Sequence, residues 1–352
     1  MGRHKFPVYK TKIKGVKQSF DLADRGQRLD YFRAKGKASI AKIEDYLNKG
    51  GTFVGFLMGK KGSGKGTRAK IFADIFGREK IAHIGIGDIV RLVHEELETE
   101  EGKKELVEYL KQDYRGYISI EKGIEAILGR SQDRVSVPDE LMLSLIKWEI
   151  DKHEGKALFI DGFPRTLDQV SYSLYFRDLM GYRDDPDFFV LVDVPEGVID
   201  ARIKNRVVCP ECKAPRGLSF MPTKLVGCDE KGFYLMCDNP ECRKARMMSK
   251  EGDDKGIESI RSRLDDDGAL LDKAFSLHGV PKVLLRNSVP LDDKSLVDEY
   301  EITPEFYYEE KDEKVITKTR PWVVKDDDGV DSYSLLPEPN VLVMIEQIAE
   351  IL

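Results

Sequence analysis

One nine-residue stretch limits the fold of this chain more than any other. It is Gly59 to Thr67, with the sequence GKKGSGKGT, and it directly follows the apolar run TFVGFLM. Glycines let consecutive backbone N–H groups converge on one anion, and a helix that begins there adds the positive end of its dipole. The pattern of Gly59, four residues, Gly64 and Lys65 therefore predicts a phosphate-binding loop between a strand and a helix. A glycine turn with solvated lysines is the alternative.

Further short apolar runs have the length of buried strands, namely IAHIGI, ALFID and FFVLVDV. Helical patterns such as DELMLSLIKWEIDKH lie between them. Strands that alternate with helices are typical of a parallel sheet wound on both faces. The sequence therefore predicts an α/β fold of the P-loop NTPase type, which is a parallel sheet with helices on both faces.

The charge and composition exclude several classes of protein. The net charge is −6 with a pI of about 5.6, so the whole molecule has no general attraction to nucleic acid or to anionic membranes. No apolar run approaches the ~20 residues that span a bilayer, and the first residues lack the apolar centre of a signal peptide. We expect a cytoplasmic protein without a membrane partner, and a monomer is favoured.

Four of the five cysteines occur in two close pairs. Cys209 and Cys212 form a C-x2-C motif, and Cys237 and Cys242 form a C-x4-C motif. Paired cysteines with proline-containing turns suit tetrahedral ligation of structural Zn²⁺ in a zinc-ribbon insert. Cys228 is expected to be a spectator, although it could replace one ligand. Nucleic-acid binding through this module is a second idea, because basic residues lie within it: Lys213, Arg216, Arg243, Lys244 and Arg246.

The last four residues of the glycine loop resemble the corresponding loop of a known family. Gly66 separates Lys65 from Thr67, as in the GKGT ending of nucleoside monophosphate kinases. Further motifs follow in that family's order: GDIVR at 87–91, DGFPRTLDQ at 161–169, DVPEGVIDARIKNR at 193–206 and SIRSRL at 259–264. Over about 210 residues the chain resembles an adenylate kinase with a zinc-bearing lid, which implies the reaction ATP + AMP ⇌ 2 ADP.

The resemblance implies roles for individual residues on the ATP side. The loop and its lysine would hold the ATP phosphates, Arg202 would pack on the adenine, and Asp161 would position Mg²⁺ through water. The implied ATP-binding set is Gly62, Ser63, Gly64, Lys65, Gly66, Thr67, Arg202 and Arg206. The implied catalytic set is Lys65, Asp161, Arg206 and Arg263.

On the acceptor side the resemblance implies that arginines clamp the AMP phosphate and that Gln169 pairs with the adenine edge. The implied AMP-binding set is Arg91, Val137, Gly162, Arg165, Gln169 and Arg263. Kinases of pyrimidine monophosphates carry asparagine in place of this glutamine, which favours AMP over UMP or CMP as the acceptor.

Several positions depart from the family pattern. Lys60 and Lys61 replace the usual Ala-Pro of the loop, and they would add charge near the phosphates or face solvent. Ile86 replaces a threonine that contacts AMP, and Lys250 stands near the place of a lid arginine. These departures leave a second hypothesis open, a nucleotide-binding regulatory or nucleic-acid-associated protein with little turnover.

The expected domain organisation follows from these motifs. Residues 1–50 hold 13 Lys and Arg against 5 Asp and Glu, which indicates a basic N-terminal extension. The P-loop core is expected at 51–206 with an acceptor region at about 86–140, and the zinc lid at 207–250. Residues 251–352 would complete the core, with an insertion at about 277–297 and an acidic C-terminal part, where residues 291–352 hold 6 Lys and Arg against 17 Asp and Glu.

Overall fold

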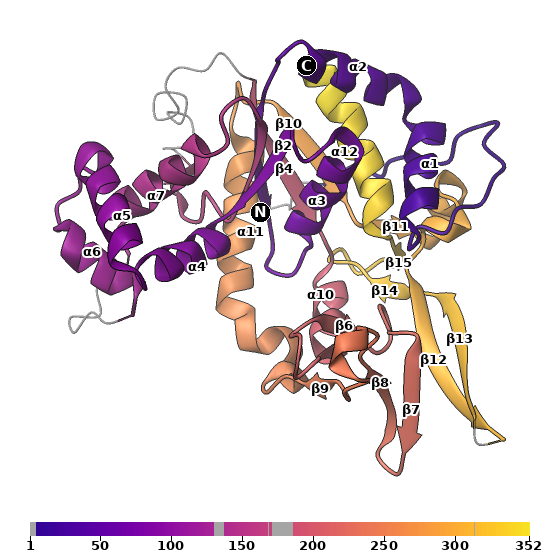
Figure 1. The fold of residues 1–352 in the computed structure, drawn as a ribbon. Helices are drawn as coiled ribbons and strands as arrows, with labels where there is room; N and C mark the ends of the chain where they lie inside the picture. The colour runs from indigo at the N-terminus through magenta and orange to yellow at the C-terminus, as the bar shows by residue number, and fades with distance from the viewer. Residues whose placement is uncertain (1–4, 130–136, 168, 171–185, 313) are drawn as a thin grey trace.

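A five-stranded parallel sheet forms the centre of the molecule (Figure 1). The computed structural model describes residues 5–129, 137–167, 169–170, 186–312 and 314–352. The strand order is β10-β4-β1-β3-β2, and every neighbouring pair is parallel. The strands are β1 (Val54–Gly59), β2 (Ile81–Gly85), β3 (Ala157–Asp161), β4 (Asp187–Asp193) and β10 (Lys282–Arg286). The predicted parallel α/β sheet is confirmed.

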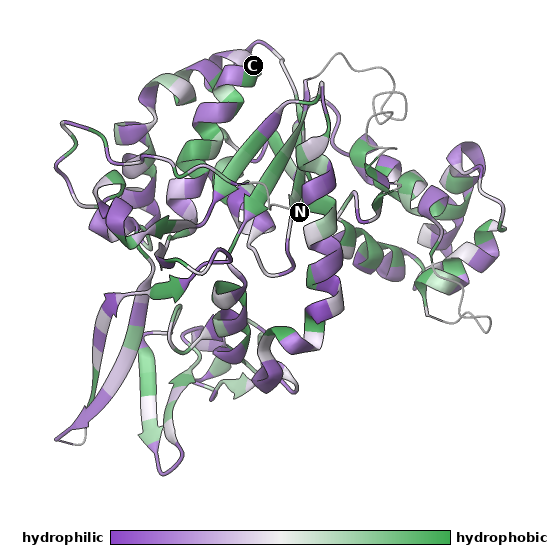
Figure 2. Cartoon of the chain, turned by 180° about the vertical axis from the view of Figure 1, so that it is seen from behind, coloured by the Kyte–Doolittle hydropathy of each residue, from purple (hydrophilic) through white to green (hydrophobic). Residues whose placement is uncertain are grey.

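Helices cover both faces of this sheet, and the side chains of β1 alternate between two cores. Leu57 packs into a core with α1 (Arg25–Lys35), α2 (Lys37–Asn48), α3 (Lys65–Phe76) and α12 (Pro337–Ile351). Phe56 and Met58 pack into the opposite core with α4 (Ile86–Glu96), α7 (Asp139–Asp151) and α11 (Arg261–Ser276). Figure 2 shows the central strands as the most hydrophobic part of the ribbon. Burial on both faces explains why the strands are nearly continuous apolar runs.

Four helices project to one side of the sheet in Figure 1, where the acceptor region was expected. They are α4, α5 (Glu100–Asp113), α6 (Ile120–Ile127) and α7. Thr99 caps α5 and Ser119 caps α6, because each side chain accepts a hydrogen bond from a first-turn N–H. Residues 130–136 of this region, and residue 168 of the DGFPRTLDQ motif, lie outside the described residues.

The N-terminal segment is attached to the rest of the chain through a buried ion pair. Residues 5–24 contain no helix or strand, and α1 and α2 follow them. Lys35 Nζ lies 2.7 Å from Glu301 Oε1, and neither side chain is exposed. Tyr31 and Thr11 donate further hydrogen bonds to the Glu301 carboxylate. These bonds satisfy the carboxylate in the interior and join the first helix to the C-terminal part of the chain.

A small module of short strands follows α10 (Glu196–Lys204). Its three-stranded sheet contains β5 (Arg206–Val208), β6 (Pro215–Gly217) and β9 (Met248–Ser249), and β7 (Leu225–Asp229) pairs with β8 (Gly232–Met236). We call residues 206–249 the cysteine module. Its buried core is small and consists of Leu235 and Met247 with three of the cysteines.

The structure differs from the sequence analysis over residues 277–297. Part of this expected insertion is β10, which pairs with β4 and completes the parallel sheet. The additional structure follows it, in residues 288–336, which we call the C-terminal β-segment. It contains β11 (Ser288–Pro290), β12 (Pro304–Lys311), β13 (Lys314–Pro321), β14 (Val323–Lys325) and β15 (Asp331–Ser334).

The C-terminal β-segment contacts the cysteine module along β12 (Figure 1). The Phe306 N–H donates to the Ser219 carbonyl at 2.7 Å, and the Tyr308 hydroxyl donates to the Leu218 carbonyl at 2.7 Å. The Phe220 and Trp322 rings stack with their centroids 3.8 Å apart. Among the residues described, no helix is long and apolar enough to cross a membrane.

Candidate functional site

The predicted phosphate loop lies between the end of β1 and the start of α3. Gly62 and Gly64 have φ angles of 85° and 78°, a region that residues with a Cβ rarely adopt. The Ser63 hydroxyl is fully buried and has no hydrogen-bond partner within the described part of the chain. Because a buried hydroxyl without a partner is costly, this atom fits a ligand oxygen bound inside the loop.

Lys65 is held at the start of α3 with its ammonium group against the loop. Its Nζ donates to the Gly59 carbonyl at 2.8 Å and to the Lys60 carbonyl at 3.3 Å, and it lies 3.9 Å from Asp161 Oδ1. Burial lowers the pKa of Lys65, while the negative charges of Asp161 and Asp267 act in the opposite direction. The ammonium is therefore held mainly by two neutral carbonyl oxygens, and Asp161 is a more distant counter-ion.

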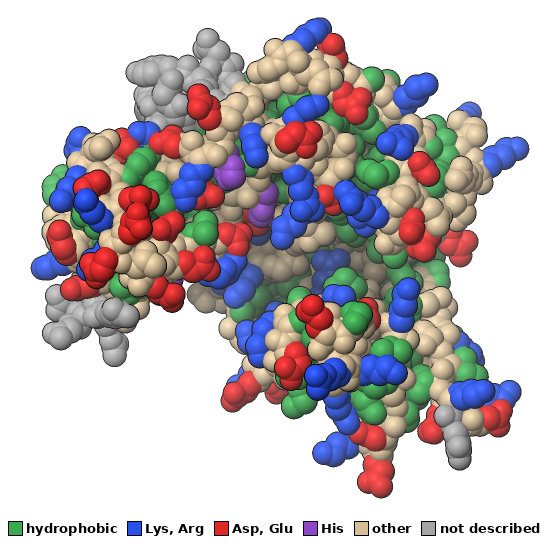
Figure 3. All heavy atoms as spheres, viewed as in Figure 1, with side chains coloured by type: hydrophobic (Ala, Val, Ile, Leu, Met, Phe, Trp, Pro, Cys, Tyr) green, Lys and Arg blue, Asp and Glu red, His purple; other side chains and the backbone are tan. Residues whose placement is uncertain are grey.

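A cleft of about 290 Å³ opens in front of this loop. Figure 3 shows a hollow bordered by Lys and Arg side chains between the core and the cysteine module. The carboxylates in its lining belong to Asp88, Asp161 and Asp267. Of the residues expected at the site, the structure brings these to the cleft: Gly62, Lys65, Arg91, Asp161, Gly162, Arg165 and Arg263.

The arginines of the cleft come from separate elements, and two of them, Arg165 and Arg263, lie close enough to influence one another. Arg91 is on α4, Arg165 follows β3, and Arg263 is on α11. Burial lowers the pKa of Arg165, and the nearby charge of Arg263 lowers it further. Arg91 forms an ion pair with Asp88 on the same helix. A concentration of like charge of this kind stabilises a bound polyanion.

The Gln169 side chain is buried and both ends of its amide have protein partners. Its Oε1 accepts the Arg165 N–H at 2.6 Å, and its Nε2 donates to Asp139 Oδ1 at 2.5 Å. The residue therefore fixes the backbone of Arg165. Val137 is half-buried, and it belongs to the core that includes α7.

Two arginines expected at the site lie away from the cleft lining. Arg206 forms a two-bond pair with Asp253, with Nε–Oδ2 and Nη2–Oδ1 distances of 2.7 and 2.6 Å. This pairing raises the pKa of Arg206. Arg202 is on α10, where burial lowers its pKa to about 10. Ser63, Gly64, Gly66 and Thr67 belong to the loop and its helix but do not line the cleft.

The positions that depart from the family pattern have clear environments. Lys60 is buried, with its Nζ 3.2 Å from Glu196 Oε1 and paired also with Asp327, so it neither faces solvent nor points at the cleft. Lys61 is exposed, and its backbone N–H donates to Asp267. Ile86 is buried beside the cleft, and a Cβ added at Gly162 would lie 3.4 Å from it.

The residues at the end of the cysteine module do not bring an arginine to the cleft where the family pattern has one. Lys250 and Glu251 are exposed and absent from the cleft lining. Arg246 is paired with Asp229 at 2.6 Å, and its guanidinium lies 3.8 Å from the centroid of the Tyr234 ring. The Arg246 side chain is therefore held within the cysteine module.

Arg68 is a structural residue of the site that the sequence analysis missed. It is buried in α3, and it donates to the Ser63 carbonyl at 2.6 Å and the Gly64 carbonyl at 3.1 Å. It also donates to the side chains of Asn287 and Asn340 at 2.9 and 2.7 Å. Its position on the buried stripe of α3, four residues before Phe72, was the available signal.

His83 is a second residue that the sequence analysis missed. It is on β2 and lines the cleft, with its Nε2 3.9 Å from Asp161 Oδ2. This nitrogen is buried, and no hydrogen bond to it is found among the described residues. Because residues two apart on a strand lie on the same face, its place two residues before Gly85 was the available signal.

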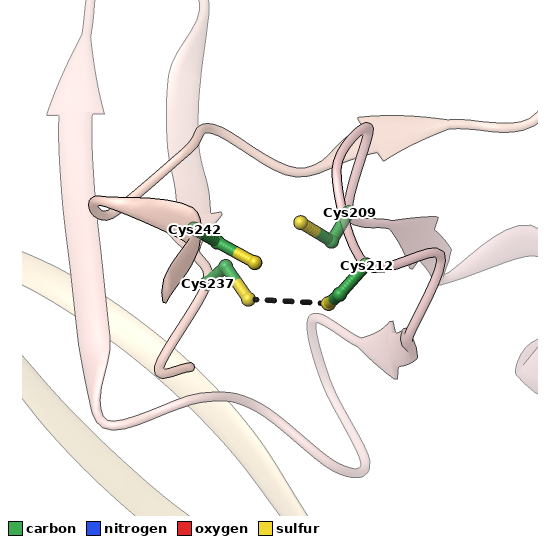
Figure 4. A group of neighbouring side chains, drawn as sticks. All are labelled: Cys209, Cys212, Cys237 and Cys242. Carbon is green, nitrogen blue, oxygen red and sulfur yellow. Dashed lines mark hydrogen bonds between the residues drawn. The ribbon is translucent and has the colours of Figure 1, made fainter. Parts of the chain in front are cut away.

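The two predicted cysteine pairs form one cluster (Figure 4). The sulfur atoms of Cys209, Cys212, Cys237 and Cys242 all lie within 4.8 Å of one another, and the Cys212–Cys237 separation is 3.7 Å. A Zn²⁺ tetrahedron with bonds of about 2.3 Å has sulfur–sulfur edges of about 3.8 Å, so the arrangement fits that ion. Burial opposes ionisation, yet the N–H groups of Cys212 and Glu211 lower the pKa of Cys209 to about 7. Cys228 lies outside the cluster, against Glu310.

The comparisons with known proteins agree with this geometry. No family model matches the chain. It is 33% identical over 211 residues to an adenylate kinase from Clostridium acetobutylicum, which covers 59% of this chain and 79% of that protein. It is 34% identical over 197 residues to an adenylate kinase from Staphylococcus aureus, which covers 54% of this chain and 78% of that protein. The chain is therefore a phosphotransferase that belongs to the adenylate kinase family.

Proposed function

We propose that the protein transfers the γ-phosphoryl group of ATP to AMP and so forms two molecules of ADP. The observation that carries this proposal is the cleft itself, whose lining combines Lys65 and the phosphate loop with Arg91, Arg165, Arg263 and Asp161. A bond forms between an AMP phosphate oxygen and the γ-phosphorus, and the bond from the bridging oxygen to that phosphorus breaks. Two polyanions must meet for this step, so positioning and charge neutralisation dominate catalysis.

The loop side of the cleft is proposed to hold ATP. The amides of residues 62–67 and the Ser63 hydroxyl bind its phosphate oxygens, and the Lys65 ammonium binds the phosphate that is transferred. Lys65 already lies against neutral carbonyls, so binding phosphate replaces weak partners with a charged one. Arg202 is proposed to pack on the adenine, and Arg206 to reach the phosphates after it leaves Asp253.

The opposite side is proposed to hold AMP. Arg91 and Arg165 clamp its phosphate, because a guanidinium can bind two oxygens at once. Arg263 lies between the two nucleotides and binds both. Gln169 is proposed to pair with the adenine edge together with Val137 and Gly162, which requires its amide to leave Asp139. Ile86 leaves no hydroxyl at this end of the cleft, which weakens AMP binding by about 1 kcal/mol.

Two metal ions belong to this proposal. Mg²⁺ bound with ATP would neutralise phosphate charge, and Asp161 would hold it through water because the ion prefers carboxylate, phosphate and water oxygens. Zn²⁺ would be held by the four clustered cysteines in a structural role. The cysteine module then acts as a lid, and its closure excludes water so that AMP receives the phosphate.

A coupled kinase assay of the purified protein with ATP and AMP, CMP, UMP or GMP tests the proposal. We expect turnover that is selective for AMP. Lys65→Met and Arg165→Ala each lower kcat/KM for AMP by about 10³-fold with little change in melting temperature. Arg33→Ala is the control, because Arg33 is exposed on α1 and does not line the cleft.

Each other outcome of this assay has a clear meaning. Absence of turnover with all four acceptors would support a regulatory binding protein. Faster turnover with UMP or CMP would support a pyrimidine nucleotide kinase and contradict the role given to Gln169. Full activity of Lys65→Met or Arg165→Ala would contradict the proposed site.

A further inference from the structure

Asp267 places a negative charge inside a cleft that otherwise gathers cations. The residue is on α11, four positions after Arg263, so both side chains lie on the same face of the helix. Its Oδ2 accepts the backbone N–H of Lys61 at 2.7 Å, and the residue lines the cleft. The carboxylate therefore lies at the mouth of the phosphate loop.

The charge of Asp267 acts on the groups that are proposed to bind phosphate. It acts to raise the pKa of Lys65 and the pKa of Arg165, against the lowering that burial causes. A charge that attracts these cations must repel an anion bound among them. The repulsion grows with the charge of the ligand, so it is larger for metal-free ATP than for ATP whose charge is reduced by a bound divalent cation.

We propose that Asp267 is a specificity-determining residue that makes the phosphate loop prefer magnesium-complexed nucleoside triphosphate over the metal-free form. This inference rests on the proposed function, because it takes the loop to be the ATP site. It goes beyond that function by naming a residue that selects between two charge states of the ligand. The bond to Lys61 holds the carboxylate in place, so its repulsion is built into the cleft before any ligand arrives.

The helix that carries Asp267 has its own anchors, so the charge can be removed without loss of the fold. Leu264, Leu270 and Leu271 of α11 are buried in the two cores. Asparagine at position 267 keeps an oxygen that can accept the Lys61 N–H, and it removes only the charge. Asp266 is the exposed neighbour on the same helix, so Asp266→Asn removes the same charge outside the cleft lining.

Calorimetric titration with ATP, once in chelator-free buffer from which Mg²⁺ has been removed and once in excess Mg²⁺, tests the inference on the full-length zinc-loaded protein. For Asp267→Asn we expect metal-free ATP to bind about tenfold more tightly and magnesium ATP to change less than about threefold. The preference for the magnesium complex therefore falls. Asp266→Asn is expected to keep the preference of the wild type. Asp267→Ala repeats the charge removal without the hydrogen bond, and it should show the same loss of preference.

Other results would overturn the inference. An equal change in both affinities would assign Asp267 a general effect on the loop. Weaker binding of magnesium ATP with unchanged metal-free ATP would show that the carboxylate attracts the metal. Weaker binding of both forms with a lower melting temperature would assign it a structural role. If neither the wild type nor any variant binds either form of ATP, the proposed function fails as well. If the wild type binds ATP and the preference is unchanged in Asp267→Asn, only this inference fails.

Discussion

The base of the phosphate loop gathers four hydrogen-bond acceptors, and the cysteine module gathers four sulfur atoms. The two regions differ in where the positively charged partner of these atoms comes from. Arg68 brings one buried cation under the loop, and the chain itself supplies the acceptors from Ser63, Gly64, Asn287 and Asn340. The cysteine module brings four sulfur atoms within 4.8 Å, an arrangement that could hold a metal ion. The base of the loop is therefore completed by the chain itself, whereas the module is proposed to be completed by a metal.

Metal removal tests the module side of this comparison and should have the largest effect. Stripping zinc with a chelator, or replacing Cys242 with Ser, should unfold the module, because its buried core is too small to stabilise it. Structural zinc sites contribute about 10 kcal/mol or more to the folding of small peptides. Loss of hydrogen-exchange protection at Leu235, together with loss of bound zinc, would be the measurement.

Cys228→Ser is the control for metal removal, because Cys228 lies outside the cluster. It should keep one zinc ion per chain. An unchanged melting curve after chelation, with no zinc found in the protein, would contradict the metal site.

Replacement of Arg68 tests the loop side. Arg68→Met keeps the length of the side chain but leaves buried acceptors on Ser63, Gly64, Asn287 and Asn340 without their donor. We expect a loss of about 3–5 kcal/mol in the free energy of unfolding, measured with urea. Arg78→Met is the control, because Arg78 is exposed beyond the end of the same helix, and it should change stability by less than about 0.5 kcal/mol. Equal stability of the two variants would show that the base of the loop does not depend on Arg68.

The smallest effect is expected at Lys60, which joins the loop to two acids. Lys60→Met should cost about 1–2 kcal/mol, because it leaves Glu196 and Asp327 without this partner. Burial acts to raise the pKa of Glu196, but Arg261 and Lys60 hold it below its usual value. Its contribution is therefore present above about pH 4.3 and is lost as the pH falls through the lower, folded pKa.

Urea unfolding of the wild type and Lys60→Met between pH 3 and pH 7 measures this contribution. The difference between the two proteins should be largest at pH 7 and should shrink as Glu196 is protonated. A difference that stays constant over this range would show that the ion pair does not contribute.

Much of the fold could be predicted because its signals are local. The run TFVGFLM, the glycine loop and the two cysteine pairs are each only a few residues long. The residue types in each one predict its local backbone structure. The strand β10 was missed because residues 277–297 interrupt the family's usual run from the arginine helix to the final strand, which suggested an insertion. Its assignment depends on its pairing with β4, about 90 residues earlier, and no local pattern reports that pairing.

The site was predictable to the same extent and for the same reason. The family resemblance implied which arginines would serve a phosphate site, but it did not give the partner that each one meets in the structure. Arg206 pairs with Asp253 and Gln169 pairs with Asp139, which are contacts across 47 and 30 residues. The effect of Asp267 on the loop also depends on how α11 packs, which spacing alone does not give.

The stack of Phe220 on Trp322 has a practical consequence for measuring lid motion. One ring belongs to the cysteine module and the other to the C-terminal β-segment, and the chain has one other tryptophan, at position 148. Any swing of the module that separates the two rings would change the surroundings of an indole. The molecule thus contains its own fluorescent reporter, so the proposed lid closure could be followed in stopped-flow experiments without an added dye.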